Sequence, residues 1–114
     1  MKLWQPENPL GIYFAVVNTS STATIVIGRP NQQIVLVSSS IIASNFVGIQ
    51  WVSSPSSTAL SGIQQVAQNG GYILPFNAGG WLETLIGESL VLTLAPSVQV
   101  GGMISYVWAN QLGN

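Results

Sequence analysis

The chain has 114 residues, of which two are basic and three acidic, and it contains no histidine and no cysteine. This length suits one domain with a core of its own, but about a quarter of the residues of a typical soluble domain are charged. The five charges here are too few for the basic surface that binds nucleic acid or anionic membranes, and the missing cysteine and histidine exclude disulfides, thiolate nucleophiles and zinc sites of the cysteine type.

The chain begins with a segment that we expect to form an irregular arm. Pro6 and Pro9 disfavour helical conformation in the residues that precede them. The segment turns polar at once and lacks the apolar run of a signal peptide, and no stretch of 18 apolar residues follows that would suggest a transmembrane helix. We therefore expect an N-terminal arm over residues 1–9 and a single β-sandwich domain over residues 10–114.

Beyond the arm, Val, Ile, Thr and aromatic residues recur in short runs separated by Gly, Pro, Asn and Ser, a pattern typical of strands and turns. Alternation in the second run places Ala23, Ile25 and Ile27 on one face. The glycine pair Gly101-Gly102 predicts a bulge in the last strand. Strands are expected over residues 10–17, 22–27, 33–38, 46–53, 59–68, 72–76, 81–85, 89–94 and 98–109. Of these, residues 59–68 also fit a helical turn, but Gly62 and the flanking pattern favour a strand.

Two patterns indicate the core. Leu90, Leu92 and Leu94 alternate with smaller or more polar residues and are expected to point inward. Residues 33–38 are apolar almost throughout, which favours burial on both faces. Short strands at spacings of about 8–12 residues predict an all-β fold, an antiparallel, jelly-roll-like β-sandwich of about eight short strands.

The second half of the chain carries a series of short motifs that combine glycine, proline and aromatic residues. They are Asn69-Gly70-Gly71, Leu74-Pro75, Gly80-Trp81-Leu82-Glu83-Thr84, Gly87-Glu88-Ser89-Leu90 and a closing strand that reaches Tyr106-Val107. In this order they resemble small β-sandwich virion proteins of tailed bacteriophages, particularly capsid decoration or cement proteins.

The resemblance implies a role as well as a fold. It implies a virion protein, made in the host cytoplasm, that decorates the capsid surface, ties neighbouring subunits of the major capsid protein together and forms a homo-oligomer. The alternative is a tail- or fibre-associated or carbohydrate-binding module for host attachment. A non-viral ice-binding module would need a regular threonine array, for which Thr22-Ala23-Thr24 is too short, and an intracellular ligand-binding barrel would copurify with small molecules.

No catalytic, cofactor-binding or metal-binding residue is predicted. Glu83 and Glu88 are the one nearby carboxylate pair, and paired carboxylates serve in glycosidases, but glutamates near strand ends more often accept backbone hydrogen bonds. Serine has no histidine to act as its general base, and three acidic residues do not form a calcium loop of ordinary ligand density. The sequence therefore predicts a protein that is not an enzyme.

Aromatic and apolar residues outside the predicted strands are the candidates for partner contact. Trp51 and Trp108 lie in strand patterns and are expected in the core. Trp4 lies in the arm, where it either docks on its own domain or serves as an anchor in a partner's pocket. Trp81 follows two glycines at a corner, where it either closes the sandwich or stands at a contact surface. The predicted partner-binding residues are Leu3, Trp4, Pro6, Pro9, Phe76 and Trp81.

Overall fold

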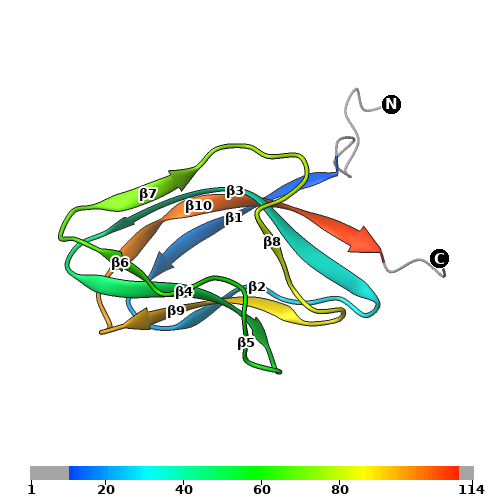
Figure 1. Ribbon diagram of the computed structural model, residues 1–114, viewed down its shortest axis with the longest axis horizontal. Helices are drawn as coiled ribbons and strands as arrows, with labels where there is room; N and C mark the ends of the chain where they lie inside the picture. The colour runs from blue at the N-terminus through cyan, green and yellow to red at the C-terminus, as the bar shows by residue number, and fades with distance from the viewer. Residues whose placement is uncertain (1–10, 111–114) are drawn as a thin grey trace, which may run out of the picture.

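The structure is a computed structural model that describes residues 11–110, and it shows two β-sheets packed face to face (Figure 1). Sheet A has the strand order β1-β10-β3-β7, with β8 also pairing β3, and sheet B has the order β2-β9-β4-β5, with β6 also pairing β4. The strands are β1 (Ile12–Thr19), β2 (Ala23–Val26), β3 (Gln32–Ala43), β4 (Val47–Ser54), β5 (Thr58–Ala59), β6 (Gln64–Val66), β7 (Gly71–Leu74), β8 (Leu82–Glu83), β9 (Ser89–Ala95) and β10 (Val100–Asn110).

The predicted all-β sandwich is confirmed, with ten strands in place of about eight. The difference arises because β5 and β6 both pair with β4, and β7 and β8 both pair with β3, so that two strand positions are each divided. Loops that contain Gly62 and Pro75 separate the halves, and neither residue favours a continuous ladder. With β5 and β6 counted as one position and β7 and β8 as another, the chain changes sheet at each step except from β4 to β5, which both lie in sheet B, an order that fits a jelly roll.

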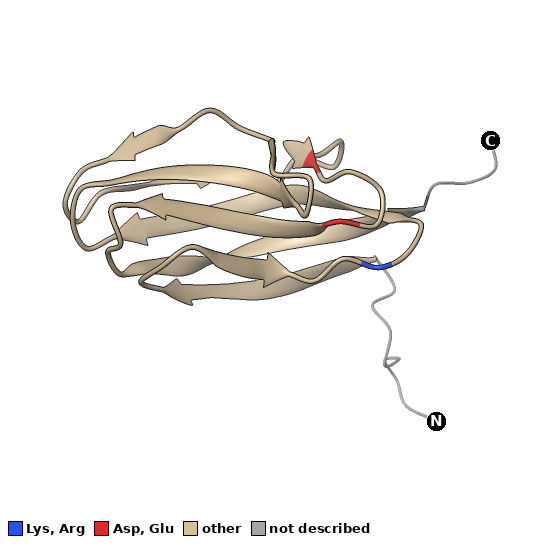
Figure 2. Cartoon of the chain, turned by 90° about the horizontal axis from the view of Figure 1, so that it is seen from below, with Lys and Arg blue, Asp and Glu red and all other residues tan. Residues whose placement is uncertain are grey.

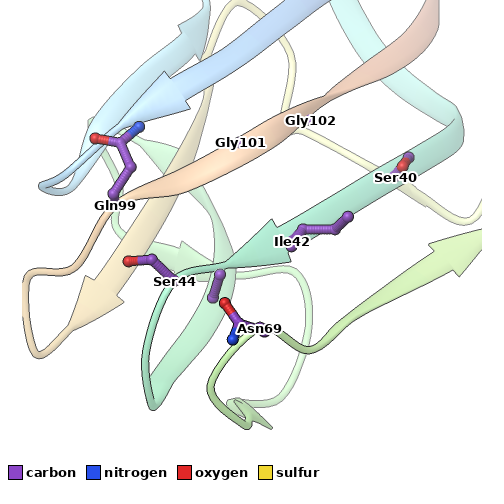
Figure 3. A pocket seen from close by; sticks show the side chains of 8 residues that line it. Ser40, Ile42, Ser44, Asn69, Gln99, Gly101 and Gly102 are labelled. Atoms are coloured by element: carbon purple, nitrogen blue, oxygen red, sulfur yellow. The ribbon is translucent and has the colours of Figure 1, made fainter.

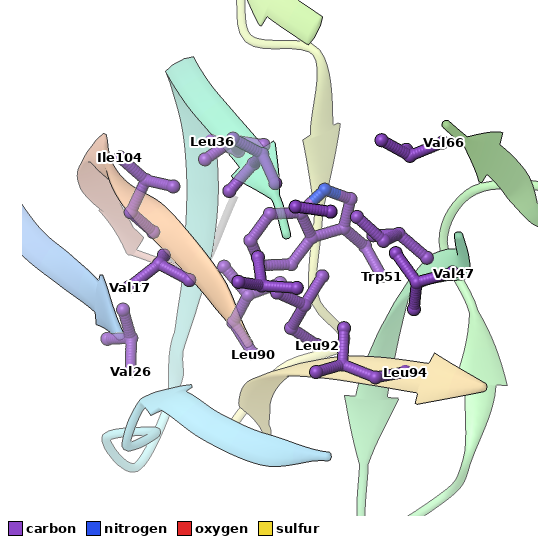
Figure 4. Close-up of a cluster of buried hydrophobic side chains, with 14 of the residues drawn as sticks. Val17, Val26, Leu36, Val47, Trp51, Val66, Leu90, Leu92, Leu94 and Ile104 are labelled. Carbon is purple, nitrogen blue, oxygen red and sulfur yellow. The ribbon is translucent and has the colours of Figure 1, made fainter. Parts of the chain in front are cut away.

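The inner faces of the two sheets meet around Trp51 of β4, whose side chain is 1% exposed (Figure 4). Its indole Nε1 donates a hydrogen bond to the hydroxyl of Tyr72 on β7 at 3.0 Å, which links sheet B to sheet A. Burial raises the pKa of Tyr72, and the hydrogen bond from Trp51 opposes part of this rise. Trp51 therefore fills the core and also joins the sheets, since a buried indole N–H needs an acceptor.

Much of the predicted core is confirmed. Leu90, Leu92 and Leu94 are all buried. The central part of β3, Ile34 to Val37, is buried on both faces. Sheet B covers its inner side, and on the other side Gly80, in the segment between β7 and β8, lies so close to Val35 that a Cβ on this glycine would overlap the Val35 side chain. The backbone N–H groups of Asn77 and Trp81 in that segment donate to the carbonyls of Val37 and Leu36.

The predicted face of the second strand is wrong after Thr24. Ala23 lies opposite Leu92 and Thr24 opposite Val91, but Val26 lies opposite Leu90, so that Ile25 is an extra residue in β2. This irregularity reverses the alternation. Val26 is consequently buried and Ile27 is 78% exposed.

The bulge predicted at Gly101-Gly102 is also wrong. The register of β10 against β3 shifts between Ser105 and Tyr106, where Val37 is the extra residue of β3. Gly102 serves a different purpose: it has φ +152°, and a Cβ there would overlap the carbonyl oxygen of Ser40. The glycine permits β3 and β10 to approach each other closely.

We predict that Gly102→Ala lowers the free energy of unfolding by about 2–4 kcal/mol, through overlap with β3 and backbone strain. Gly101→Ala is the matched control, because a Cβ at that position meets nothing nearer than the Val17 carbonyl oxygen at 4.0 Å. Urea unfolding of both variants measures the difference. Equal destabilisation by the two substitutions would contradict the close approach of β3 and β10.

Candidate docking surface

The outward-pointing side chains of sheet A form rows across its strands. Val16, Met103, Ser40 and Ile73 lie directly opposite one another on β1, β10, β3 and β7. Directly paired residues share one face of a sheet. Val16 is 76% exposed, Met103 48% and Ile73 73%, so three of the four side chains in this row offer apolar surface to a partner.

A second row lies beside it and contains Asn18, Gly101, Ile42 and Gly71. Ile42 is the one large side chain of this row, and it is exposed. A hollow of about 420 Å³, lined by Ser40, Ile42 and Gly101 among others, lies on one side of Ile42 (Figure 3). A hollow of about 360 Å³ reaches Gly71 and Ile73 on the β7 side. The glycines leave space for these hollows, and Ile42 is a ridge between them.

The third row consists of Phe14, Ser105 and Ser38 on β1, β10 and β3. Phe14 is exposed, and the hydroxyls of Ser38 and Ser105 hydrogen-bond to each other. The two serines therefore satisfy each other in the middle of the face. We call the five exposed apolar residues of the three rows the outer face of sheet A: Phe14, Val16, Ile42, Ile73 and Met103.

The outer side of sheet B has a different character. Gln50 lies opposite Thr93, and Thr24 opposite Val91. These residues alternate with the buried Leu92 and Trp51, so they point away from the core. The large exposed apolar residues on strands are thus on sheet A, which makes its outer face the stronger candidate for a docking surface.

The three charged residues in the described range lie away from the centre of the outer face (Figure 2). Glu83 lies on β8 opposite Val35, at one corner of sheet A. Arg29 follows β2, and its guanidinium carbon lies 4.3 Å from the ring centroid of Trp108. Such stacking is a cation–π contact, and it occupies the only described cation.

Trp108 belongs to an aromatic cluster at one end of the sandwich. Tyr106 contacts it edge-on at a centroid distance of 5.8 Å, and Tyr13 stacks on Tyr106 at the same distance. Burial raises the pKa of Tyr106, and the charge of Arg29 opposes part of the rise. Trp108 packs against the core as the sequence predicts, and Arg29 covers it.

Glu88 is held by hydroxyl groups from the β4–β5 hairpin. Its Oε1 accepts hydrogen bonds from Ser53 Oγ at 2.6 Å and from Ser56 Oγ at 2.8 Å. The Ser53 hydroxyl also accepts a hydrogen bond from the backbone N–H of Leu85. These bonds, first that from Ser53 and then that from Ser56, lower the pKa of Glu88. They give the carboxylate a structural role at the junction of β4 with the segment before β9.

The two acidic residues of the described range contact strands of different sheets. Glu83 is on a strand of sheet A, whereas Glu88 is bonded to β4 of sheet B. Residues 11–110 contain no group of three acidic, His or Cys side chains that could hold a metal ion. In the same range no helix is long and apolar enough to cross a membrane.

Four of the predicted partner-binding residues, Leu3, Trp4, Pro6 and Pro9, lie outside the described residues. The structure brings the other two, Phe76 and Trp81, into one segment between β7 and β8. Phe76 is 59% and Trp81 44% exposed. The Trp81 indole Nε1 donates to the carbonyl of Pro75 at 2.8 Å, so this side chain lies along its own loop and presents its ring to solvent.

Sequence reasoning missed the outer face itself. The signal was present in β1, where Ile12 to Val17 is apolar at odd and even positions alike. A strand of a two-sheet sandwich has only one face in the core, so such a run leaves one apolar set exposed. The same holds for Ile42, which lies between two buried residues of β3.

Comparisons with known proteins give no relative from which to transfer a role. No family model matches the chain, and no curated protein and no solved structure matches it.

We predict that folding stability depends on acid through Glu88. Because its folded-state pKa lies below the value of 4.5 for an unperturbed carboxyl, its contribution is complete above about pH 4.5 and is lost as the pH falls through the lowered value. Thermal unfolding between pH 3 and 7 should show this loss, and Glu88→Gln should flatten the profile.

Glu83→Gln is the control for removal of one carboxylate, because Glu83 is exposed and lies on β8, away from Ser53 and Ser56. If this substitution flattened the profile as much as Glu88→Gln, the assignment to the hydroxyl bonds would be wrong.

Proposed function

We propose that this chain is a structural, non-enzymatic protein that decorates the surface of a bacteriophage capsid, with the outer face of sheet A as its docking surface. It would bridge neighbouring major capsid subunits and stabilise the particle. The observation that carries the proposal is the outer face: five large apolar side chains on four strands, with no described charge among them. The bacteriophage role follows the resemblance of the second half of the chain, residues 61–107, to capsid decoration proteins.

The physical chemistry of the face suits attachment to a protein shell. Burial of apolar surface contributes about 25 cal/mol per Å², and the serines beside the apolar residues bond to each other instead of needing a charged partner. A pair of buried ions would carry a desolvation cost that neutral contacts avoid. Weak neutral contacts repeated over a lattice of identical subunits add as avidity.

The same face explains why capsid attachment is preferred to host-glycan attachment. Sugars are commonly held by aromatic rings flanked by hydrogen-bonding groups, and the exposed Trp81 already donates its indole N–H to Pro75. The outer face itself carries one aromatic residue, Phe14, among aliphatic ones. A mainly aliphatic surface suits a protein partner better than a polar sugar.

We predict that Ile73→Ser weakens binding to undecorated capsids about tenfold or more, because removal of a buried Ile side chain costs about 1.5–3 kcal/mol of contact energy. Cosedimentation over a concentration series gives the dissociation constant. Ile27→Ser is a matched control, since Ile27 is 78% exposed, against 73% for Ile73, but follows β2 of sheet B.

Two results would contradict the proposal. The first is a folded wild-type protein that shows no saturable binding to undecorated capsids. The second is equal loss of binding in the Ile73 and Ile27 variants, which would show that the outer face of sheet A makes no special contribution.

A further inference from the structure

Strand β1 forms one edge of sheet A, and no other strand of residues 11–110 pairs with its outer edge. It runs for eight residues, Ile12–Thr19, and pairs in the described part of the chain with β10 alone. In an antiparallel strand, every second residue directs its N–H and C=O away from the existing neighbour. β1 therefore presents a row of backbone donors and acceptors over its whole length.

Every other edge strand of the described sandwich is short or irregular. β2 and β7 have four residues each, β6 has three, and β5 and β8 have two; β2 also contains the register shift at Ile25. Short strands, irregularities, prolines and charges are the devices by which natural proteins protect sheet edges. β1 has none of them: its sequence IYFAVVNT lacks charge and proline, and its register with β10 is unbroken.

We propose that β1 pairs antiparallel with β1 of a second copy of this chain across a two-fold axis. The pairing would join the two copies of sheet A into one continuous sheet. Each copy supplies the same row of donors and acceptors, so one interface completes the hydrogen bonds of both edges, and the assembly closes as a dimer.

The second copy fits this edge better than another partner would. Residues close to a two-fold axis lie near their own symmetry mates, where like charges would repel. Neither β1 nor β10 contains a charged residue, so this repulsion does not arise. Pairing of β1 with the opposite edge of another copy would offer the four residues of β7, and each such contact would leave one β1 and one β7 edge still open for further copies.

The exposed side chains of β1 indicate the register. With Ala15 on the two-fold axis, Phe14 of each copy lies opposite Val16 of the other, and both pairs lie on the outer face. Aromatic and β-branched residues are favourable cross-strand neighbours. Phe14 and Val16 are 67% and 76% exposed in the single chain, and this register covers part of both. It also joins two outer faces into one surface.

Val16→Lys tests the interface without reference to capsids, so its outcome is separate from that of the proposed function. Sedimentation velocity over a range of concentrations should show a dimer for the wild-type chain and a dissociation constant raised at least about tenfold for Val16→Lys, where two lysines would lie close to the axis. Ile73→Lys is the control, because it places the same charge on the outer face but on β7. It should remain dimeric.

The chain contains no cysteine, so a single introduced cysteine shows by disulfide formation which residues lie close together in the dimer. This second test applies even if Val16→Lys fails to fold. An equimolar mixture of Phe14→Cys and Val16→Cys should oxidise chiefly to the mixed disulfide-linked dimer, identified by its mass under denaturing conditions, while Ile73→Cys should form no disulfide-linked dimer. A monomeric wild-type chain at all concentrations would overturn the proposal. So would a dimer broken by Ile73→Lys but not by Val16→Lys, or equal cross-linking through Ile73→Cys.

Discussion

The packing of two sheets around Trp51 determines which side chains of every strand remain exposed. Trp51 fills the space between the sheets, and its indole N–H donates to Tyr72 on the opposite sheet. The inward-facing side chains of the strands are therefore packed in the core. Because successive residues alternate between the two faces of a sheet, the remaining side chains of each strand must point outward. In sheet A many of these outward-pointing side chains are also apolar, and the consequence is an exposed hydrophobic surface on a well-packed domain.

The scarcity of charge also favours association with a partner. The described charges are used within the fold or lie at its margin: Arg29 stacks on Trp108, Glu88 is bonded by two serines, and Glu83 lies at a corner of sheet A. A free protein with so little charge, and with an edge strand that no strand of residues 11–110 covers, is prone to association. Closure of that edge in a dimer and attachment of the outer face to a shell would both remove this liability, and the two surfaces are adjacent on β1.

The fold class and the core were predictable from sequence because alternation and turn residues are local signals. Leu90, Leu92 and Leu94 point inward as their spacing indicates. Two predictions were wrong, the face of the second strand and the bulge at Gly101-Gly102, and both depend on how distant strands pair. The pairing of β2 with β9 makes Ile25 an extra residue, and the close approach of β3 to β10 requires Gly102. The outer face was missed for the same reason, since Val16, Met103 and Ile73 become neighbours only through the registers of β1, β10, β3 and β7. Of the predicted contact residues in the described range, Phe76 and Trp81 are exposed in one loop, because glycine, proline and aromatic residues mark such a loop locally.

The central claim is that the outer face of sheet A is the surface through which this protein binds. A reconstruction of decorated capsids by electron cryomicroscopy tests it most directly, because the orientation of a sandwich with two chemically different faces can be read from the density. The account predicts that Val16, Met103 and Ile73 face the shell and that sheet B faces solvent. Particles in which the Gln and Thr side chains of sheet B contact the shell, with the outer face of sheet A exposed, would contradict it.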